Sequence, residues 1–433
     1  MSSSPARTPR LAPEERQRQL LDAALEVLAT DGFEAVTVEA VARRAGVTRP
    51  VVYDQFGDLD GLLLALVDRE ERVALGPLLE IVGDEPGDTD PDEFLVQGVR
   101  AFLRAVREEP RTWRVVLMPP DGGSPDLRAR VVRSRRMITD RVSEQLAWGV
   151  ERRGGPRGLD EHLWARLVVA GGEDAARLVV ADPQRYSPDR LAEAARSLIG
   201  LVPRDAALAP SPVSFASEPP PNATPPVAAV PAGTRVPRVQ RRQQLLDHAL
   251  ELLAQDGFEA LSVEAIARRA GISRVVVYRS FGNLQGLVLA LLRREEAQVR
   301  RELEALIPAD PDDRPPRQFL VDALEGFLGL IEAKPLTWRV ALGRPESAPK
   351  PLQKAVARRR AELATRLRPL VAQGLEGLDA PVEDLDVDLL ARLLLTVGEE
   401  LGRIALDDPD FPVARLVDEG RRFLDVLPWS AER

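Results

Sequence analysis

Two short segments of the chain carry the same hydroxyl, arginine and tyrosine at the same spacing. They are Thr48, Arg49 and Tyr53, and, 225 residues later, Ser273, Arg274 and Tyr278. An arginine fork can donate two hydrogen bonds to guanine O6 and N7, the commonest specific contact in the major groove of DNA. Hydroxyl groups donate instead to phosphate oxygens and so position a protein on the duplex. This spacing therefore indicates recognition of double-stranded DNA.

Helical spacing separates an outward face of each segment from a buried one. Val52 and Phe56 are four residues apart and should point into a core, whereas Arg49 and Tyr53 share another face. Thr37 and Ser262 begin the preceding helices, where the positive helix end can meet a phosphate. The residues of the two reading helices expected to contact DNA are Thr48, Arg49, Pro50, Val51, Tyr53, Asp54 and Gln55, and Ser273, Arg274, Val275, Val276, Tyr278, Arg279 and Ser280.

Local signals place these residues on a helix-turn-helix. Apolar residues repeat at helical spacing from Leu21 to Leu28 and stop before Gly32, which can take the left-handed conformation. Thr37 offers a hydroxyl cap to a short helix that Gly46 ends, and Thr48 is expected to cap the next helix. Two short helices joined by a tight turn and packed under a longer helix form this motif, and its second helix is the expected reader.

The whole unit is duplicated in the sequence. Residues 20–71 recur without a gap as residues 245–296, and weaker likeness continues beyond this block at the same offset. Such self-similarity marks a repeated structural unit.

The short apolar helix, the Ala-Gly turn, the hydroxyl and the tyrosine three residues before a phenylalanine together resemble the TetR family of regulators, in both copies. The resemblance implies an all-α protein with N-terminal heads that bind a DNA operator and C-terminal helical domains that bind a small effector and dimerise. It also implies control of transcription, most often by repression. Family members often carry Lys or Arg for a phosphate where this chain has Leu59 and Leu284, so the resemblance does not extend to that contact.

The predicted organisation is two tandem units joined by a linker. Proline bias keeps the linker extended and its composition cannot build a core. Further amphipathic helices are expected at about 90–108, 126–152, 160–181 and 187–201. The expected ranges are a flexible tail at 1–12, helix-turn-helix domains at 13–75 and 237–300, helical effector and dimerisation domains at 76–203 and 301–433, and the linker at 204–236.

Arginines also cluster at the start of each unit. From flexible arms they could add charge against phosphates, although a solvated tail is the simpler interpretation. They are Arg7, Arg10, Arg16 and Arg18, and Arg235, Arg238, Arg241 and Arg242.

Composition argues against most other chemistry. The chain has no cysteine and two histidines, so neither a metal nor another cofactor is expected. It has no phosphate-binding loop, nucleophile elbow or HExxH motif, so an enzyme is not expected. A net charge of −9 confines DNA binding to a local patch. Apolar runs of about six residues are far below the ~20 of a membrane span, and a cytoplasmic protein without membrane contact is expected.

A pocket for a small effector is the further expectation for the helical bodies. Aromatic and methionine side chains could line an apolar pocket, and plain core packing is the alternative for each of them. These residues are Phe102, Trp113, Met118, Met137, Trp164, Phe327 and Trp338.

Because one chain holds two heads, the simplest assembly is an intramolecular pseudo-dimer on an imperfect palindrome. Pairing of each unit with its equivalent in a second chain is the competing arrangement. A helical interaction scaffold that has lost specific DNA binding is the alternative function, which the preserved hydroxyl, arginine and tyrosine oppose.

The copies differ at Asp54 and Arg279, and this predicts unequal half-sites. A carboxylate repels phosphate or accepts from a cytosine amino group, whereas an arginine attracts phosphate or reads guanine. Exchanging the two residues, as Asp54→Arg with Arg279→Asp, should reverse the preferred orientation of the operator in a binding-site selection. An unchanged orientation would contradict the assignment.

Overall fold

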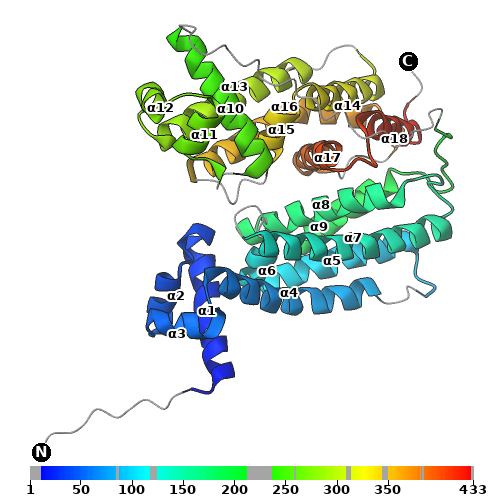
Figure 1. The fold of residues 1–433 in the computed structure, drawn as a ribbon. Coiled ribbons are helices and arrows are strands. Elements are labelled where there is room, and N and C mark those ends of the chain that lie inside the picture. Colours follow the sequence, from blue (N-terminus) through cyan, green and yellow to red (C-terminus); the bar gives the residue numbers. More distant parts are fainter. Residues whose placement is uncertain are drawn as a thin grey trace, which may run out of the picture. The chain divides into compact units, whose positions relative to one another are not determined.

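The computed structural model describes residues 11–83, 87–117, 124–211, 237–257, 260–308, 314–343, 350–380, 382 and 385–430. Within these ranges the secondary structure is α-helical, apart from turns, a 3-10 helix at Phe33–Ala35 and two isolated β-bridges at Arg157–Ala207 and Leu378–Trp429. The predicted all-α fold is confirmed (Figure 1). The helices of the first copy are α1 (Pro13–Asp31), α2 (Val38–Ala45), α3 (Arg49–Phe56), α4 (Leu59–Gly83), α5 (Pro91–Glu108), α6 (Pro110–Val116), α7 (Pro125–Arg153), α8 (Glu161–Ala181) and α9 (Pro188–Gly200). Those of the second are α10 (Arg238–Asp256), α11 (Val263–Arg269), α12 (Arg274–Phe281), α13 (Leu284–Leu306), α14 (Pro316–Ala333), α15 (Pro335–Leu342), α16 (Lys350–Glu376), α17 (Val387–Asp407) and α18 (Val413–Asp425).

The predicted Thr37 cap is confirmed, and Ser262 caps the equivalent helix of the second copy. The Thr37 hydroxyl accepts a hydrogen bond from the Ala40 N–H at 3.0 Å, and the Ser262 hydroxyl accepts one from Ala265 at the same distance. Gly46 ends α2 at φ +67°, a left-handed conformation that glycine adopts without steric cost. These local interactions fix the turn that precedes the reading helix.

The predicted cap by Thr48 is wrong. Thr48 is the N-cap residue of α3, but its side chain makes no capping hydrogen bond. Pro50 has no N–H to offer it, and the Val51 N–H donates to the Thr48 carbonyl oxygen at 3.0 Å. Ser273 at the start of α12 likewise makes no side-chain cap, so neither hydroxyl is used in capping.

Several of the predicted arm arginines are helical instead. Arg16 and Arg18 lie within α1, and Arg238, Arg241 and Arg242 lie within α10. Arg242 donates to the carbonyl oxygen of Ser280 and stacks over the Phe281 ring at 4.1 Å, which holds it against α12. Arg7, Arg10 and Arg235 are outside the described residues.

The chain divides into two compact units, one with residues 1–89, 93–142 and 172–193 and the other with residues 90–92, 143–171 and 194–433. In the first unit, Leu20, Val41, Val52 and Leu66 are fully buried where α1 to α4 meet. Val115 of α6 belongs to the same cluster. The head and the adjoining body of this unit therefore share one core.

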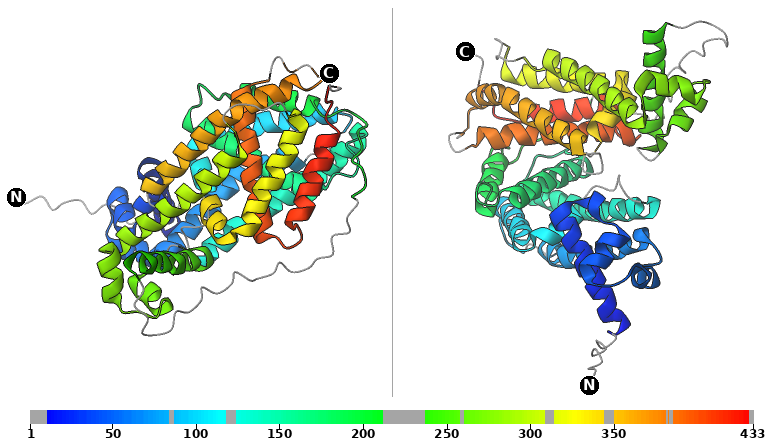
Figure 2. Two further views of the ribbon diagram at one scale, coloured as in Figure 1. Left: turned by 90° about the horizontal axis from the view of Figure 1, so that it is seen from above. Right: turned by 90° about the vertical axis from the view of Figure 1, so that its left-hand side faces the viewer.

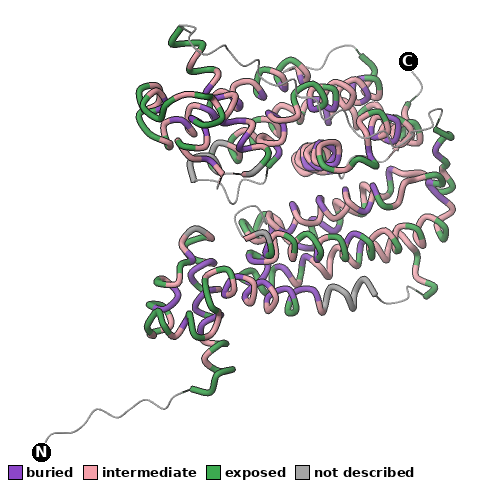
Figure 3. Tube along the Cα trace, viewed as in Figure 1, coloured by how far each residue is buried: buried purple, intermediate pink, exposed green. Residues whose placement is uncertain are grey.

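The second unit repeats this head core and adds a larger helical body. Leu245, Ile266, Leu287 and Leu291 are fully buried among α10 to α13. Behind them, α14, α16, α17 and α18 run alongside one another (Figure 2), and the buried residues lie on the sides of the helices that face each other (Figure 3). Trp338 of α15 is part of this body core.

Among the described residues, no single helix has the length and apolar character of a membrane span. Among these residues, α12 and α13 reach the length and apolar composition of a span only when they are taken as one segment, and the two helices are bent by 62° relative to each other.

Gly402 lies where α17 packs closely against its neighbouring helices. A Cβ atom there would lie 2.6 Å from Leu342 Cδ1 and 2.8 Å from Ile331 Cδ1, whereas one at Gly398 of the same helix would meet nothing within 4 Å. Because overpacked cores lose stability, Gly402→Ala should lower the free energy of unfolding by about 1–3 kcal/mol. Gly398→Ala should raise it by up to about 1 kcal/mol through helix propensity. Urea unfolding of both variants measures this, and equal effects would contradict the packing argument.

Candidate nucleic-acid interface

The reading helices α3 and α12 each bury a single residue and leave one face open. Val52 and Val277 are 0% and 1% exposed. On the opposite side, Tyr53 and Tyr278 are 50% and 51% exposed, and Val275 is 57% exposed. The predicted site residues that are exposed are Thr37, Thr48, Arg49, Pro50, Tyr53, Asp54, Ser273, Arg274, Val275, Tyr278 and Arg279, and those that are half-buried are Val51, Gln55, Ser262, Val276 and Ser280.

Two hydroxyls of the predicted site differ in what they can offer a ligand. The Thr37 oxygen accepts from Ala40 in its cap, and a hydroxyl that accepts still has a hydrogen to donate. The Ser280 hydroxyl donates to the Val276 carbonyl at 2.9 Å, so its hydrogen is used inside α12. Thr37 is therefore the better phosphate donor of the two.

Each predicted base-reading arginine pairs with a glutamate that the sequence interpretation had not considered. Arg49 donates to Glu39, in the first turn of α2, and Arg274 donates to Glu264, in the first turn of α11. The signal was present in the sequence, because a glutamate stands ten residues before the arginine in both copies.

A polar chain, a linked series of ion pairs and hydrogen bonds, also joins the head to the body in the first unit. Asp22 of α1 pairs with Arg69 at 2.6 Å, and Arg69 pairs with Glu70 at 2.7 Å. Glu70 is 3% exposed and accepts from the Thr112 hydroxyl at 2.7 Å. A buried carboxylate is costly unless it is paired, and here it is paired on two sides.

The second unit contains the same polar chain of ion pairs and hydrogen bonds. Asp247 pairs with Arg294 at 2.6 Å, Arg294 with Glu295 at 2.7 Å, and Glu295 accepts from the Thr337 hydroxyl at 2.7 Å. The recurrence of both threonines in the sequence was visible, but their contacts with α4 and α13 required the packing of the helices.

Glu71, which follows Glu70, and the equivalent Glu296 of the second copy have different partners: Glu71 contacts Ser134 and Arg130, whereas Glu296 lies 3.6 Å from Arg358. Burial raises the pKa of the Glu71 carboxyl above its ordinary value, against the opposing effects of a hydrogen bond from Ser134 and the charge of Arg130. In the second unit, burial lowers the pKa of Arg359, which donates to the Ala341 carbonyl at 2.9 Å. The two bodies therefore have different polar interiors.

The aromatic residues proposed for an effector pocket form separate pairs. Phe102 and Trp113 pack edge to face with their ring centroids 5.1 Å apart, and Phe327 and Trp338 do the same with a centroid distance of 5.3 Å. Trp164 packs instead on Phe423 at 4.1 Å. Met118 is outside the described residues, and a pocket lined by these side chains stays a prediction.

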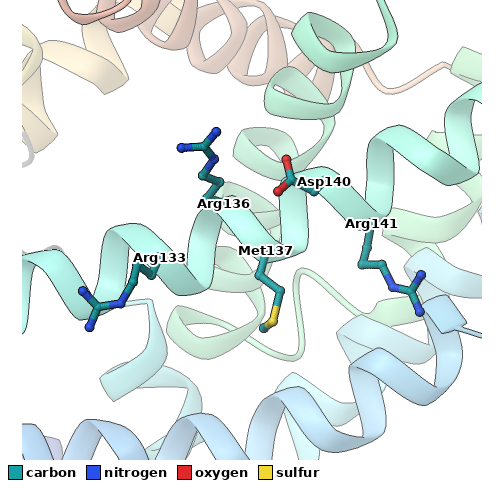
Figure 4. Close-up of a pocket in the computed structure, with 5 residues that line it drawn as sticks. All are labelled: Arg133, Arg136, Met137, Asp140 and Arg141. Carbon is teal, nitrogen blue, oxygen red and sulfur yellow. The ribbon is translucent and has the colours of Figure 1, made fainter.

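Two hollows lie elsewhere in the described structure. One of about 460 Å³ is open to solvent along α7 and is lined by Arg133, Arg136, Met137, Asp140 and Arg141 (Figure 4). Met137 is 42% exposed there, among charged neighbours rather than in an apolar enclosure. The other, next to Arg359, has about 20 Å³, room for about one water molecule.

Among the described residues, no group of three or more His, Asp or Glu side chains could hold a metal ion.

Comparison with known proteins adds to this geometry. Residues 20–66 and 245–291 both match the family of bacterial regulatory proteins called the tetR family, and residues 91–201 match the tetracyclin repressor-like C-terminal domain. Two helix-turn-helix heads with helical domains define a DNA-binding regulator of transcription. The chain belongs to the TetR family, and it carries two units of that type in tandem.

Each of the following relatives matches less than half of the chain. The chain is 36% identical over 100 residues to the HTH-type transcriptional activator FasR of Mycolicibacterium smegmatis. This match covers 23% of this chain and 44% of FasR, so the chain spans less than half the length of that relative. It is 27% identical over 177 residues to the HTH-type transcriptional regulator BetI of Escherichia coli, 36% of this chain and 84% of BetI. A TetR-like transcriptional regulator from Rhodococcus sp. RHA1 is 26% identical, covering 44% of this chain and 96% of its own with a TM-score of 0.36.

Proposed function

We propose that the protein is a ligand-responsive transcriptional repressor that binds an imperfect palindromic operator with both heads of one chain. The observation that carries this proposal is the duplicated open face of α3 and α12, each with an arginine at its first residue and a tyrosine four residues later. Both faces are exposed while their opposite sides are buried, as a helix that enters the major groove requires.

The side chains have separate roles in this proposal. Arg49 and Arg274 read guanine, because a planar fork matches O6 and N7. Tyr53, Tyr278 and Thr37 bind phosphate oxygens and set the register of each head. Asp54 and Arg279, which stand at equivalent exposed positions, make the two half-sites unequal.

Ion pairs within the second compact unit support an intramolecular pseudo-dimer. This unit includes residues 143–171 of the first copy together with the whole second copy. Arg166 Nη1 of α8 lies 2.6 Å from Asp408 Oδ2, which follows α17, and Arg415 Nη2 of α18 lies 2.7 Å from Asp160 Oδ2. Late helices of both copies thus share charged contacts, as in an interface between two subunits.

Apolar contacts in the same unit have the reciprocal pattern that a two-fold axis requires. Trp164 packs on Phe423. Their equivalents, with the helices exchanged, are Leu390 of α17 and Leu198 of α9, and these belong to one apolar cluster. We infer that the two copies use the same helix faces toward each other.

The family resemblance also supports an effector that binds the helical bodies. In this proposal the effector shifts α4 or α13, and the polar chains from Glu70 and Glu295 to the heads pass that movement on. In vitro transcription from the selected operator tests the direction of control, and we expect the protein to lower it.

Arg49→Ala with Arg274→Ala should weaken operator binding by about thirtyfold to ten-thousandfold, because each of the two bidentate base contacts contributes roughly 1–3 kcal/mol. The measurement is a gel shift at several salt concentrations with a duplex obtained by binding-site selection. Arg104→Ala with Arg421→Ala is the matched control, since these arginines are 51% and 49% exposed but lie in the bodies. Equal binding by both variants would contradict the proposal.

Light scattering of the full chain tests the pseudo-dimer, which should have the mass of one chain, 47.5 kDa. Arg166→Asp should lower the unfolding midpoint because it places two carboxylates together. Adding Asp408→Arg should restore most of the loss, since the pair is re-formed in reverse. A mass of two chains, or a double variant no better than the single one, would contradict the intramolecular arrangement.

A further inference from the structure

The first step of the inference is the pairing of each reading arginine. Arg49 Nη2 donates to Glu39 Oε2, and Arg274 Nη1 donates to Glu264 Oε1. Both glutamates are the second residue of the helix before the reader, next to the N-cap residues Thr37 and Ser262. The same contact has thus been kept on both heads.

Protein stability is a poor explanation for these pairs. Arg49 and Glu39 are 56% and 61% exposed, and Arg274 and Glu264 are 63% and 66% exposed. Exposed ion pairs contribute roughly 0–1 kcal/mol to folding because water and salt screen them. Their place on the surface proposed to meet DNA gives them a more direct effect on binding.

A carboxylate at this place acts on DNA binding in two ways. A guanidinium has five donors in a planar fork, so one that bonds a glutamate through a single nitrogen keeps donors for a guanine edge. Holding the long side chain in one orientation also reduces the entropy lost on binding. At the same time, a negative charge beside the helix N-terminus repels the phosphates of any duplex that lacks a compensating base contact.

We infer that Glu39 and Glu264 are positioning residues that set operator specificity: they aim Arg49 and Arg274 at the base edge and lower the affinity for unselected duplex DNA. The inference rests on the proposed function and deepens it. It assigns selectivity to the helix before the reader, which is not expected to touch a base.

The test uses the full chain with both Glu39→Gln and Glu264→Gln. Its affinity is measured for the selected operator and for a scrambled duplex of the same length and composition. Loss of the repelling charge should raise affinity for the scrambled duplex several-fold, and the ratio of operator to scrambled affinity should fall about tenfold. Glu39→Asp with Glu264→Asp keeps the charge and should retain the low affinity for the scrambled duplex. Circular dichroism on each variant confirms that the heads remain folded.

Glu26→Gln with Glu251→Gln is the matched control. These carboxylates pair with Arg44 and Arg269 between the first and second helices of each head, at 2.7 Å and 2.9 Å. The control removes the same charge and breaks an ion pair in each head without involving α3 or α12, and its affinity ratio should stay near that of the unaltered protein.

The outcomes separate this inference from the proposed function. If the arginine variant loses operator preference while the Glu39 and Glu264 variant keeps the full ratio, or changes it no more than the control does, the inference is overturned and the function stands. If the arginine variant also keeps its preference, the proposed function fails. A tenfold lower ratio in the Glu39 and Glu264 variant but not in the control, together with loss of preference in the arginine variant, supports both.

Discussion

The buried side of each reading helix is the constraint on which the rest of the site depends. Eight residues are too few for a stable isolated helix, so α3 needs Val52 packed in the head core and Phe56 against it. Once Val52 is buried, helical geometry leaves Arg49, Tyr53 and Asp54 on open faces. Val277 imposes the same orientation on α12, and the proposed readers are exposed because other residues of the same turn are buried.

A second constraint is the set of polar contacts that joins each head to its body. The charged chain from Asp22 through Arg69 to Glu70 joins α1 to α4, and Thr112 extends it into α6. The same four residue types recur in the second unit with the same distances. A buried carboxylate that loses its partner is costly, so each polar chain ties α4 or α13 to its neighbours, as the proposed coupling of body and head requires.

The two copies differ on the face of the reading helices that is proposed to meet DNA. On the reading helices, Asp54 is replaced by Arg279, while the buried valine is unchanged. On α8, Gly171 lies close to Leu393 of α17, since a Cβ atom there would be 3.2 Å from its Cδ1. A larger side chain at position 171 would therefore require Leu393 to move by a few tenths of an ångström.

The sequence alone determined what depends on neighbours along the chain: the helical periodicity, the turn at Gly46, the caps at Thr37 and Ser262, the duplication, and the outward side of the readers. It did not determine the arginine–glutamate pairs, the buried contacts of Glu70 with Thr112, or the packing of Trp164 on Phe423. Those contacts join residues from 10 to 259 positions apart, and they exist only once the helices have packed. Spacing can assign a residue to a helix face, but tertiary packing decides which other helix that face meets.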